Sequence, residues 1–594
     1  MTDPGLLPLN SRVLAGWLWL ASVLVIRGAT YEVAQRHPRA DDSGPGTMEQ
    51  PWKSLRPAAE HASAGDRVLI RDGEYREFVA VKASGRPDAP IRFEVAPGAH
   101  VVITGADRLT GWSRLPGGPP IYQVRWPYKF NTWSKNMTHP DDEYHRLIGR
   151  CEQVMSEGYL LRQVLESNQL APGTFYADTA HETLFAWDGG GRDLNNILVE
   201  ASTRQELLRV TGDYVEWRGV IFRYAANAAQ HGAVVLAGSH DQLENCVSED
   251  MNSSGAAFTA PGQVVRGCVF RENGQIGFGA NGAHDLLLTD CLIENNNVKG
   301  FDRGWEAGGD KLVLCRGAVM ERSRFIRNRG SGVWFDIGNE NCTVRQCLIA
   351  DNEDSGIFDE ISYGLRAQDN VIIGNGFAAT RGAWGAQAGI VLSSSPQSVV
   401  ERNLIVGNRE GFDFREQHRT TPRIGDKREV AVWNHDEIIR HNIIAYNRDA
   451  QIWGWFDLTD DRHWPADAAR DAAASKPSAP PADLAAAYKA DGSSGQPQGL
   501  RLADLHLRFE DNLYFASSGQ GSFEWGVTWR RHRSYSSLED FRKELGLDSG
   551  GQILNPEFAD PSARDFRLKP ELMTQERESY PQGSIPGVLL GPLP

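Results

Sequence analysis

The sequence predicts an all-β chain wound into a parallel β-helix, a solenoid in which every coil adds one rung to long parallel sheets. Two near-copies of one phrase carry this prediction. Gly332–Ile337 reads GVWFDI and Gly356–Ile361 reads GIFDEI, and the two phrases begin 24 residues apart. A fixed period of this size is typical of repeat architectures whose coils bury a continuous core by stacking.

A second repeat of the same size runs through most of the chain. One aligned position recurs at steps of 26, 22, 23, 32, 24, 23, 33 and 39 residues, so the short steps equal one coil and the long ones one coil plus a loop. The residues after it alternate between apolar and polar, as in a half-buried strand. The position is occupied by Val220, Cys246, Cys268, Cys291, Ser323, Cys347, Asn370, Asn403 and Asn442.

Two residue types in this repeat have a structural interpretation. The chain has seven cysteines and no CxxC pair, which favours small buried side chains in a ladder over a zinc site or a full disulfide framework. An Asn often follows the strand, and Asn suits a tight corner because it tolerates left-handed backbone geometry. These asparagines are Asn328, Asn352, Asn375, Asn408 and Asn447.

The N-terminal segment, residues 1–29, is interpreted as a signal peptide or membrane anchor. Val13–Ile26 is an apolar run behind Arg12, too short for a comfortable membrane span and suited to a signal-peptide core. We therefore expect export to the periplasm or the extracellular space. An uncleaved anchor is the alternative, and no other membrane association is expected.

Residues 30–104 are expected to form an N-terminal cap and the first coils. A helix is predicted over Pro51–Ala64, because alanines are good helix formers, and a capping element suits the atypical terminal repeat of a solenoid. The strands predicted after it are Arg67–Arg71, Phe78–Val81, Ile91–Val95 and His100–Ile103.

Residues 105–200 break the repeat and are predicted to be an inserted β-rich subdomain, with a hairpin of Gly173–Tyr176 and Thr183–Trp187. A polar segment within them is interpreted as a solvated loop rather than a metal site, because no ligand spacing organises it. It contains His139, Asp141, Asp142 and His145.

The regular coils of residues 201–460 are predicted to carry the active site. Residues 461–500 are rich in Ala, Pro, Ser and Asp and are predicted to be a low-complexity excursion. Residues 501–594 are predicted to hold C-terminal coils and a cap. The cap includes strands within Leu507–Phe515 and a helix over Ser537–Leu545 whose N-cap is Ser537.

A column of polar residues stands four positions after the coil glycines. Aligning the two phrases places Asp336 and Glu360 in this column, on consecutive coils. Neighbouring parallel strands lie about 4.8 Å apart, and two carboxyl groups about 5–5.5 Å apart are typical of a retaining glycosidase. The column predicted from the sequence is Asn281, Asp336, Glu360, Ser393 and Arg415.

Strand alternation predicts which side chains accompany the two acids. It turns Val333 and Phe335 inward and sends Trp334 outward with Asp336, and it sends Phe358 outward with Glu360. Aromatic faces commonly support sugar rings. Strict alternation would bury Asp359, which is costly, so the strand is expected to end there and Asp359 stays open as a rival acid.

Loops on one side of a solenoid often build its binding face. The 32-residue step contains GWEAGGDK, with Trp305, Glu306 and Lys311 as candidate substrate-binding residues. The 39-residue step contains Arg415, Glu416, His418 and Arg419. The first three join Trp334 and Phe358 in the candidate substrate-binding set.

Composition excludes some partners. The net charge of −15 and the absence of a basic stripe argue against nucleic acid as a partner.

A solvated acidic ladder on one face of the solenoid is the alternative interpretation of Asp336 and Glu360. No metal or other cofactor is predicted, calcium among the exposed acids is left open, and so is the oligomeric state.

GVWFD, followed 24 residues later by the Glu of GIFDEISYG and preceded by GWEAGGDK, resembles the β-xylosidases of glycoside hydrolase family 120. The resemblance covers roughly residues 300–376. It implies a right-handed parallel β-helix and a retaining exo-hydrolase of oligosaccharides. It also implies that Asp336 is the nucleophile, Glu360 the acid/base, and Glu306 and Lys311 ligands of the sugar.

Double displacement requires an ionised Asp336 and a Glu360 whose pKa is raised, and Lys311 is expected to keep Asp336 charged. Two other functions stay open. A polysaccharide lyase acting on a uronic-acid polymer would use Lys311, Arg415 or His418, and a non-catalytic carbohydrate-binding solenoid would need neither acid.

Overall fold

The computed structural model describes residues 28–132, 148–378, 387–417, 419–456, 502–527 and 533–558. The apolar run Val13–Ile26, the polar segment with His139 and Asp141, the excursion at 461–500 and His418 lie outside them. Within these ranges no helix has the length and apolarity needed to cross a bilayer. Nor does any cluster of three or more His, Cys, Asp or Glu side chains there suit a metal ion.

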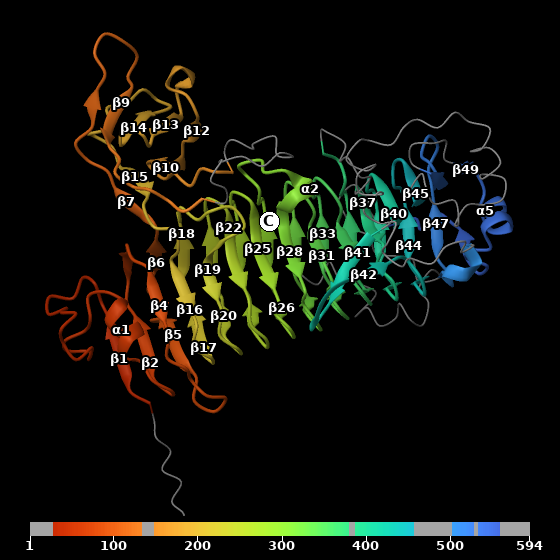
Figure 1. Cartoon of the computed structure of the whole chain (residues 1–594), viewed down its shortest axis with the longest axis horizontal. Helices are drawn as coiled ribbons and strands as arrows, with labels where there is room; N and C mark the ends of the chain where they lie inside the picture. The colour runs from red at the N-terminus through yellow and green to blue at the C-terminus, as the bar shows by residue number, and fades with distance from the viewer. Residues whose placement is uncertain are drawn as a thin grey trace, which may run out of the picture.

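The described chain is a parallel β-helix (Figure 1) built from three 13-stranded sheets. Each coil gives one strand to each sheet, and the strands are parallel apart from the last pair of the third sheet. The first sheet is β1 (Thr30–Val33), β2 (Arg67–Ile70), β5 (Ile91–Val95), β17 (Val215–Arg218), β20 (Gln242–Glu244), β23 (Val264–Arg266), β26 (Leu287–Thr289), β29 (Val319–Glu321), β32 (Thr343–Arg345), β35 (Arg366–Gln368), β38 (Val399–Glu401), β43 (Ile438–Arg440) and β46 (Arg508–Glu510).

The second sheet is β3 (Gly73–Tyr75), β6 (Val101–Thr104), β18 (Ile221–Arg223), β21 (Val247–Glu249), β24 (Val269–Arg271), β27 (Leu292–Glu294), β30 (Arg324–Ile326), β33 (Leu348–Ala350), β36 (Val371–Ile373), β39 (Leu404–Val406), β44 (Ile443–Ala445), β47 (Leu513–Phe515) and β50 (Gln552–Ile553). The third sheet, which carries the candidate site, is β4 (Val79–Val81), β16 (Leu208–Val210), β19 (Gly232–Leu236), β22 (Ser254–Phe258), β25 (Ile276–Asn281), β28 (Gly308–Val313), β31 (Val333–Asp336), β34 (Ile357–Glu360), β37 (Ala388–Ser393), β40 (Glu410–Glu416), β45 (Ala450–Phe456), β48 (Phe523–Val527) and β49 (Arg533–Tyr535).

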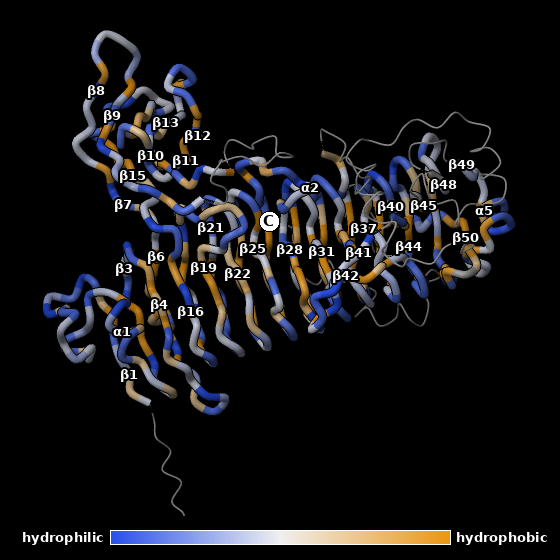
Figure 2. The backbone as a smooth tube through the Cα atoms, in the orientation of Figure 1, coloured by the Kyte–Doolittle hydropathy of each residue, from blue (hydrophilic) through white to orange (hydrophobic). Residues whose placement is uncertain are grey.

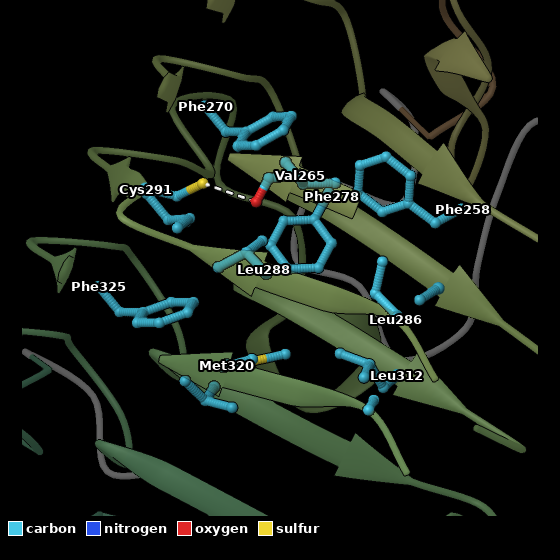
Figure 3. Packing of buried hydrophobic residues seen from close by; sticks show 14 of the residues in the cluster. Phe258, Val265, Phe270, Phe278, Leu286, Leu288, Cys291, Leu312, Met320 and Phe325 are labelled. Carbon is cyan, nitrogen blue, oxygen red and sulfur yellow. Dashed lines mark hydrogen bonds between the residues drawn. The ribbon is translucent and has the colours of Figure 1, made fainter. Parts of the chain in front are cut away.

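The core runs along the inside of the solenoid. Figure 2 shows apolar strands in successive coils with hydrophilic corners between them. Phe258, Phe270 and Phe278 from neighbouring coils pack at ring-centroid distances of 5.5 to 6.3 Å (Figure 3). Each aromatic ring removes a large apolar area from water, and stacking such rings coil upon coil stabilises an architecture whose single coils have no core of their own.

The cysteine position is a buried ladder, as predicted. All seven cysteines are free and buried. The backbone N–H of Cys246 donates to Sγ of Cys268 at 3.4 Å, and that of Cys268 donates to Sγ of Cys291 at 3.4 Å. The sulfurs therefore accept main-chain hydrogen bonds at the turn into the second sheet.

The asparagine ladder has a different cause from the one predicted. The left-handed residue at each corner precedes the asparagine, as Arg327 (φ 56°) precedes Asn328 and Asp351 (φ 58°) precedes Asn352. The Asn side chains instead stack in the interior, where Nδ2 of Asn328 donates to Oδ1 of Asn352 at 3.0 Å. They are present because each amide satisfies buried backbone groups of its neighbours.

The N-terminal helix is shorter than predicted. It is α1 (Arg56–His61), because side chains bind the preceding backbone and hold it as a loop. Oδ1 of Asp42 accepts the N–H groups of Lys53 and Ser54. At the other end of the chain the predicted C-terminal helix is present as α5 (Leu538–Leu545), and Ser537 Oγ accepts the N–H of Asp540 as its N-cap.

The described residues of 106–132 and 148–202 form two small sheets that project beside the first coils (Figure 1). The four-stranded sheet is β11 (Tyr159–Leu160), β10 (Val154–Ser156), β15 (Val199–Ser202) and β7 (Ala106–Arg108). The five-stranded sheet is β12 (Arg162–Val164), β13 (Thr174–Asp178), β14 (Thr183–Trp187), β9 (Tyr122–Arg125) and β8 (Ser113–Arg114). The predicted hairpin is the antiparallel pair β13–β14.

Candidate active site

The predicted polar column exists as a row of aligned strand ends in the third sheet. Asn281 pairs with Val313 and Val313 with Asp336. Glu360 pairs with Ser393, and Ser393 with Arg415. Between these two runs, β31 and β34 pair in a register that matches Trp334 with Phe358. Two residues further along, that register places Asp336 beside Glu360, on strands about 4.8 Å apart.

The side chains of these strands divide between two faces as alternation predicts. Val333 and Phe335 lie in the main core, whereas Trp334 and Phe358 form a separate outer cluster with Ala388 and Val391. The two rings stack, with centroids 5.4 Å apart and an interplanar angle of 24°. Both acids therefore share the outer face with a pair of aromatic rings.

Asp359 does not end its strand, and this corrects the sequence-based expectation. β34 continues through Glu360, and Asp359 pairs with Phe335 and Leu392, whose side chains belong to the main core. Asp359 is 1% exposed, accepts a hydrogen bond from Ser398 Oγ at 3.3 Å, and has its pKa raised by burial to about 8. A protonated carboxyl makes its burial tolerable. Facing the interior, Asp359 is no rival to Glu360.

Backbone strain marks the corner just after both acids. Ile337 has φ 53° and Ile361 has φ 41°. A β-branched side chain rarely adopts this left-handed region, and such residues cluster at functional sites. The equivalent corner after Ser393 is also left-handed, at Ser394 with φ 50°.

A lysine from the upstream coil holds Asp336. Lys311, on β28, places Nζ 3.0 Å from Oδ2 of Asp336, and Nζ also donates to the carbonyl oxygen of Trp305 at 3.0 Å. The same ammonium lies 4.1 Å from the centre of the Trp334 ring, within cation–π range. The predicted contact between Lys311 and Asp336 is thus present in the structure.

Glu306 stands at the end of the short helix α2 (Arg303–Glu306), which precedes β28. Its Oε2 accepts from Nε2 of Gln230 at 2.8 Å, and its carbonyl oxygen accepts from Nε2 of Gln275 at 2.8 Å. Burial raises the pKa of Glu306, against the positive charge of Lys311, and the charge of Asp336 raises it further. Glu306 is therefore electrostatically part of the same site.

An arginine that the sequence did not single out as a site residue binds Glu360. Nη1 of Arg419 lies 2.7 Å from Oε1 of Glu360. Arg419 begins a hairpin of β41 (Arg419–Arg423) and β42 (Asp426–Val432), which lies against the third sheet near β31 (Figure 1). Arg423 binds the hairpin to the coils. Its Nε donates to Oε1 of Glu340 at 2.8 Å, and its guanidinium carbon lies 4.0 Å from the centre of the Tyr363 ring.

Arg415 and Glu416 both lie on strand β40 and face opposite ways: Arg415 holds the place predicted for it in the polar column, whereas the loop predicted to contain both residues begins after them. Arg415 is 3% exposed, and its guanidinium lies 5.8 Å from the centre of the Phe358 ring on the outer face. Glu416 is fully buried, and its Oε2 accepts the N–H of Asn434 at 2.9 Å. The prediction that Glu416 binds substrate is therefore wrong, because strand alternation turns it into the solenoid. His418 is not described.

The electrostatics of the two acids differ from the expectation. Burial raises the pKa of Asp336, and the negative charge of Glu360 raises it further, against Lys311. Burial would also raise the pKa of Glu360, but the guanidinium groups of Arg419 and Arg415 outweigh it, so this pKa is lowered. The two pKa values are therefore shifted in opposite directions, upward for Asp336 and downward for Glu360. The double displacement predicted from the sequence needs the opposite: a raised pKa on Glu360 and an ionised Asp336.

The comparisons agree with this fold. Residues 232–384 match the family model described as a right handed beta helix region. The complex structure of XylC with xylose superposes with a TM-score of 0.61 at 17% identity, covering 89% of this chain and 87% of that chain. The prediction of a right-handed parallel β-helix is confirmed.

One curated relative matches over a short stretch. The uncharacterized protein YwoF of Bacillus subtilis (strain 168) is 43% identical over 68 residues. This match covers 11% of the present chain and spans only 14% of the length of YwoF.

Proposed function

We propose that this protein is a retaining glycoside hydrolase that cleaves oligosaccharides by double displacement with Asp336 and Glu360. The observation that carries the proposal is the register of β31 and β34, which sets the two carboxyls on neighbouring rungs of one outer face. A spacing near one rung suits a retaining mechanism and leaves too little room for the water that an inverting enzyme places between its acids. XylC, the β-helix whose structure holds xylose, supports a sugar as the ligand.

In the first step an oxygen of Asp336 forms a bond to the anomeric carbon. The bond from that carbon to the leaving oxygen breaks, and the leaving oxygen takes the proton of Glu360. In the second step water attacks the same carbon and gives a proton to Glu360. The bond to Asp336 breaks, so both carboxyls return to their first state with the sugar released in its original configuration.

This scheme needs a protonated Glu360, whereas Arg419 and Arg415 lower the pKa of Glu360 in the free protein. Arg419 stands on a hairpin outside the coils, and a shift of its side chain away from Glu360 would raise that pKa. Lys311, at 3.0 Å, would then keep Asp336 ionised for the attack. The reversed roles, with Asp336 as acid and Glu360 as nucleophile, follow if Arg419 stays in place.

The contacts of Lys311 argue against its use as the base of a lyase. A lyase base takes a proton from carbon and so needs a free lone pair. The ammonium of Lys311 is ion-paired with Asp336, and an ammonium has donors only. A mechanism based on two carboxyls needs no metal or organic cofactor. The apolar run Val13–Ile26 is like the core of a signal peptide and supports export as part of the proposal.

The test is a panel of nitrophenyl glycosides, with the β-xyloside first, followed by NMR of the first sugar anomer released. Retention of configuration, unchanged by a metal chelator, supports the proposal. Inversion would refute double displacement. Absorbance of an unsaturated uronate on a uronic-acid polymer, without cleavage of any glycoside, would establish a lyase instead.

A further inference from the structure

Three polar side chains form a compact group on one side of the acid pair, here named the arginine cluster: Arg415, Gln417 and Arg419. Oε1 of Gln417 accepts from Nη2 of Arg415 at 2.9 Å and from Nη1 of Arg419 at 3.3 Å. Because both guanidinium groups donate to the same neutral amide oxygen, the two groups lie close to each other. Gln417 is 4% exposed and Arg415 3% exposed, so the group is built into the protein and is not a surface coincidence.

The chemistry of this group matches a carboxylate ligand. Arg415 is buried while the side chain of Arg419 is 31% exposed, and the two neighbouring positive charges repel each other, so an anion placed against both is favoured. A guanidinium presents a planar fork of donors that fits the two oxygens of a carboxylate. Arg419 already makes a contact of this kind, with the carboxylate of Glu360 at 2.7 Å.

The cluster is placed where a ring substituent of the bound sugar would lie. Glu360, Ser393 and Arg415 follow one another on adjacent strands of the third sheet. The carboxylate of a uronic acid is carried by C5, across the ring oxygen from the anomeric carbon. A sugar whose anomeric carbon lies between the two acids, and whose ring oxygen is turned toward Ser393, reaches the cluster with its C5 substituent.

A second, independent observation points to a ligand at the same place. Ser393 is fully buried on the strand between Glu360 and Arg415, in register with both. Among the described residues its hydroxyl has no hydrogen-bond partner. A buried hydroxyl without a partner is costly, and a ligand oxygen would satisfy it.

We propose that the arginine cluster binds the carboxylate of a uronic acid unit at the point of cleavage, an inference that rests on the proposed glycosidase function. Such a substrate competes with Glu360 for Arg419. The hydrolase then acts on acidic sugars and prefers them to the neutral sugars of the same configuration.

The test compares matched pairs of aryl glycosides that differ only at C6: glucuronide with glucoside, and galacturonide with galactoside, each in both anomeric forms. The inference predicts that kcat/KM for at least one uronide exceeds that of its neutral partner tenfold or more, since a charge-assisted hydrogen bond is worth about 1.5–3 kcal/mol. Cleavage of neutral glycosides in preference to every uronide overturns the inference and leaves the proposed function standing.

Binding is measured separately, by calorimetry on the wild-type protein with free glucuronate, galacturonate, glucose and galactose. Uronate binding without cleavage of any glycoside would sink the proposed hydrolase and keep the carboxylate site. Absence of uronate binding overturns the site, whatever the protein hydrolyses.

Three variants localise the effect. Arg415→Met should lower kcat/KM for the uronide about tenfold or more with a smaller effect on its neutral partner. Gln417→Glu places a carboxylate of the protein between the two arginines, so it should abolish the preference for uronides. Arg440→Met, which breaks a salt bridge to Glu401 on another sheet, is the matched control and should leave the uronide-to-neutral ratio unchanged. Equal losses on both substrates in Arg415→Met would contradict the assignment.

Discussion

Arg419 donates to Glu360 at 2.7 Å, although 59 residues separate the two in the chain. The contact exists because Glu360 ends a strand of one coil while Arg419 begins a hairpin inserted two strands further along the same sheet. It sets the charge state of the proposed acid.

Asp336→Asn removes the proposed nucleophile and retains the shape of the side chain. We expect the turnover of an activated aryl glycoside to fall about a thousandfold or more, because no covalent intermediate can form. Added azide or formate should restore turnover and give a product of inverted configuration, read by NMR. Wild-type rates in this variant would end the assignment.

Glu360→Ala removes the proposed acid/base. With a good aryl leaving group the first step survives, so azide should accelerate release and yield a glycosyl azide of retained configuration. If azide instead gives the inverted product in Glu360→Ala and the retained product in the Asp336 variant, then Glu360 is the nucleophile. That result would show that Arg419 stays on Glu360 during the reaction.

Lys311→Met removes the positive charge next to Asp336. Without it the pKa of Asp336 rises further, because burial and the negative charge of Glu360 already raise it. The acidic limb of the kcat/KM profile should therefore move to higher pH, with kcat reduced about tenfold or more at neutral pH. If the acidic limb of the kcat/KM profile stays at the same pH, the charge of Lys311 does not control the ionisation of Asp336, and the role of Lys311 is limited to packing on Trp334.

Asp359→Asn tests the buried interior acid by its effect on stability. The pKa of Asp359 is about 8 in the folded protein, raised from 3.8 by burial. Since the folded pKa is the higher one, the protonated carboxyl contributes stability that is complete below about pH 4 and is lost as pH rises towards 8. The amide cannot ionise, so this variant should match the wild type near pH 4.

Above pH 8 the same variant should be more stable than the wild type by an amount on the order of a few kcal/mol. Chemical denaturation at several pH values measures the difference. Glycosidase activity in Asp359→Asn should persist, because the side chain lies inside the coil. A variant that is inactive yet folded would contradict the interior placement of this acid.

Much of the coil architecture follows from the local pattern. A period of one coil, with inward apolar side chains and corner residues at fixed offsets, leaves few ways to bury the core. It was therefore possible to predict the strand ends that carry Asp336 and Glu360 and the outward aromatic pair from residues 332–361 alone. The proximity of Lys311 to Asp336 could be predicted in the same way, because GWEAGGDK belongs to the coil immediately before that of Asp336.

Other features depend on contacts that no local pattern encodes. Asp359 stays in its strand because Ser398, from the next coil, donates to it. Glu416 faces inward because β40 continues through it, so that alternation puts it on the same face as the core residues Phe412 and Phe414; its pairing with Phe456 of β45 shows this continuation. The asparagines stack in the interior because each amide reaches the amide of the following coil.

The amino-acid sequence by itself determined the solenoid and the two acids, because coil period and alternation are local and repeat many times. Tertiary structure decided the charge state of those acids and the arginine cluster beside them. Arg419 lies on an insertion, and the path of an insertion is set by where it docks, here on Glu340 and Tyr363. A carboxyl's pKa depends on distances between such segments, which periodicity does not specify.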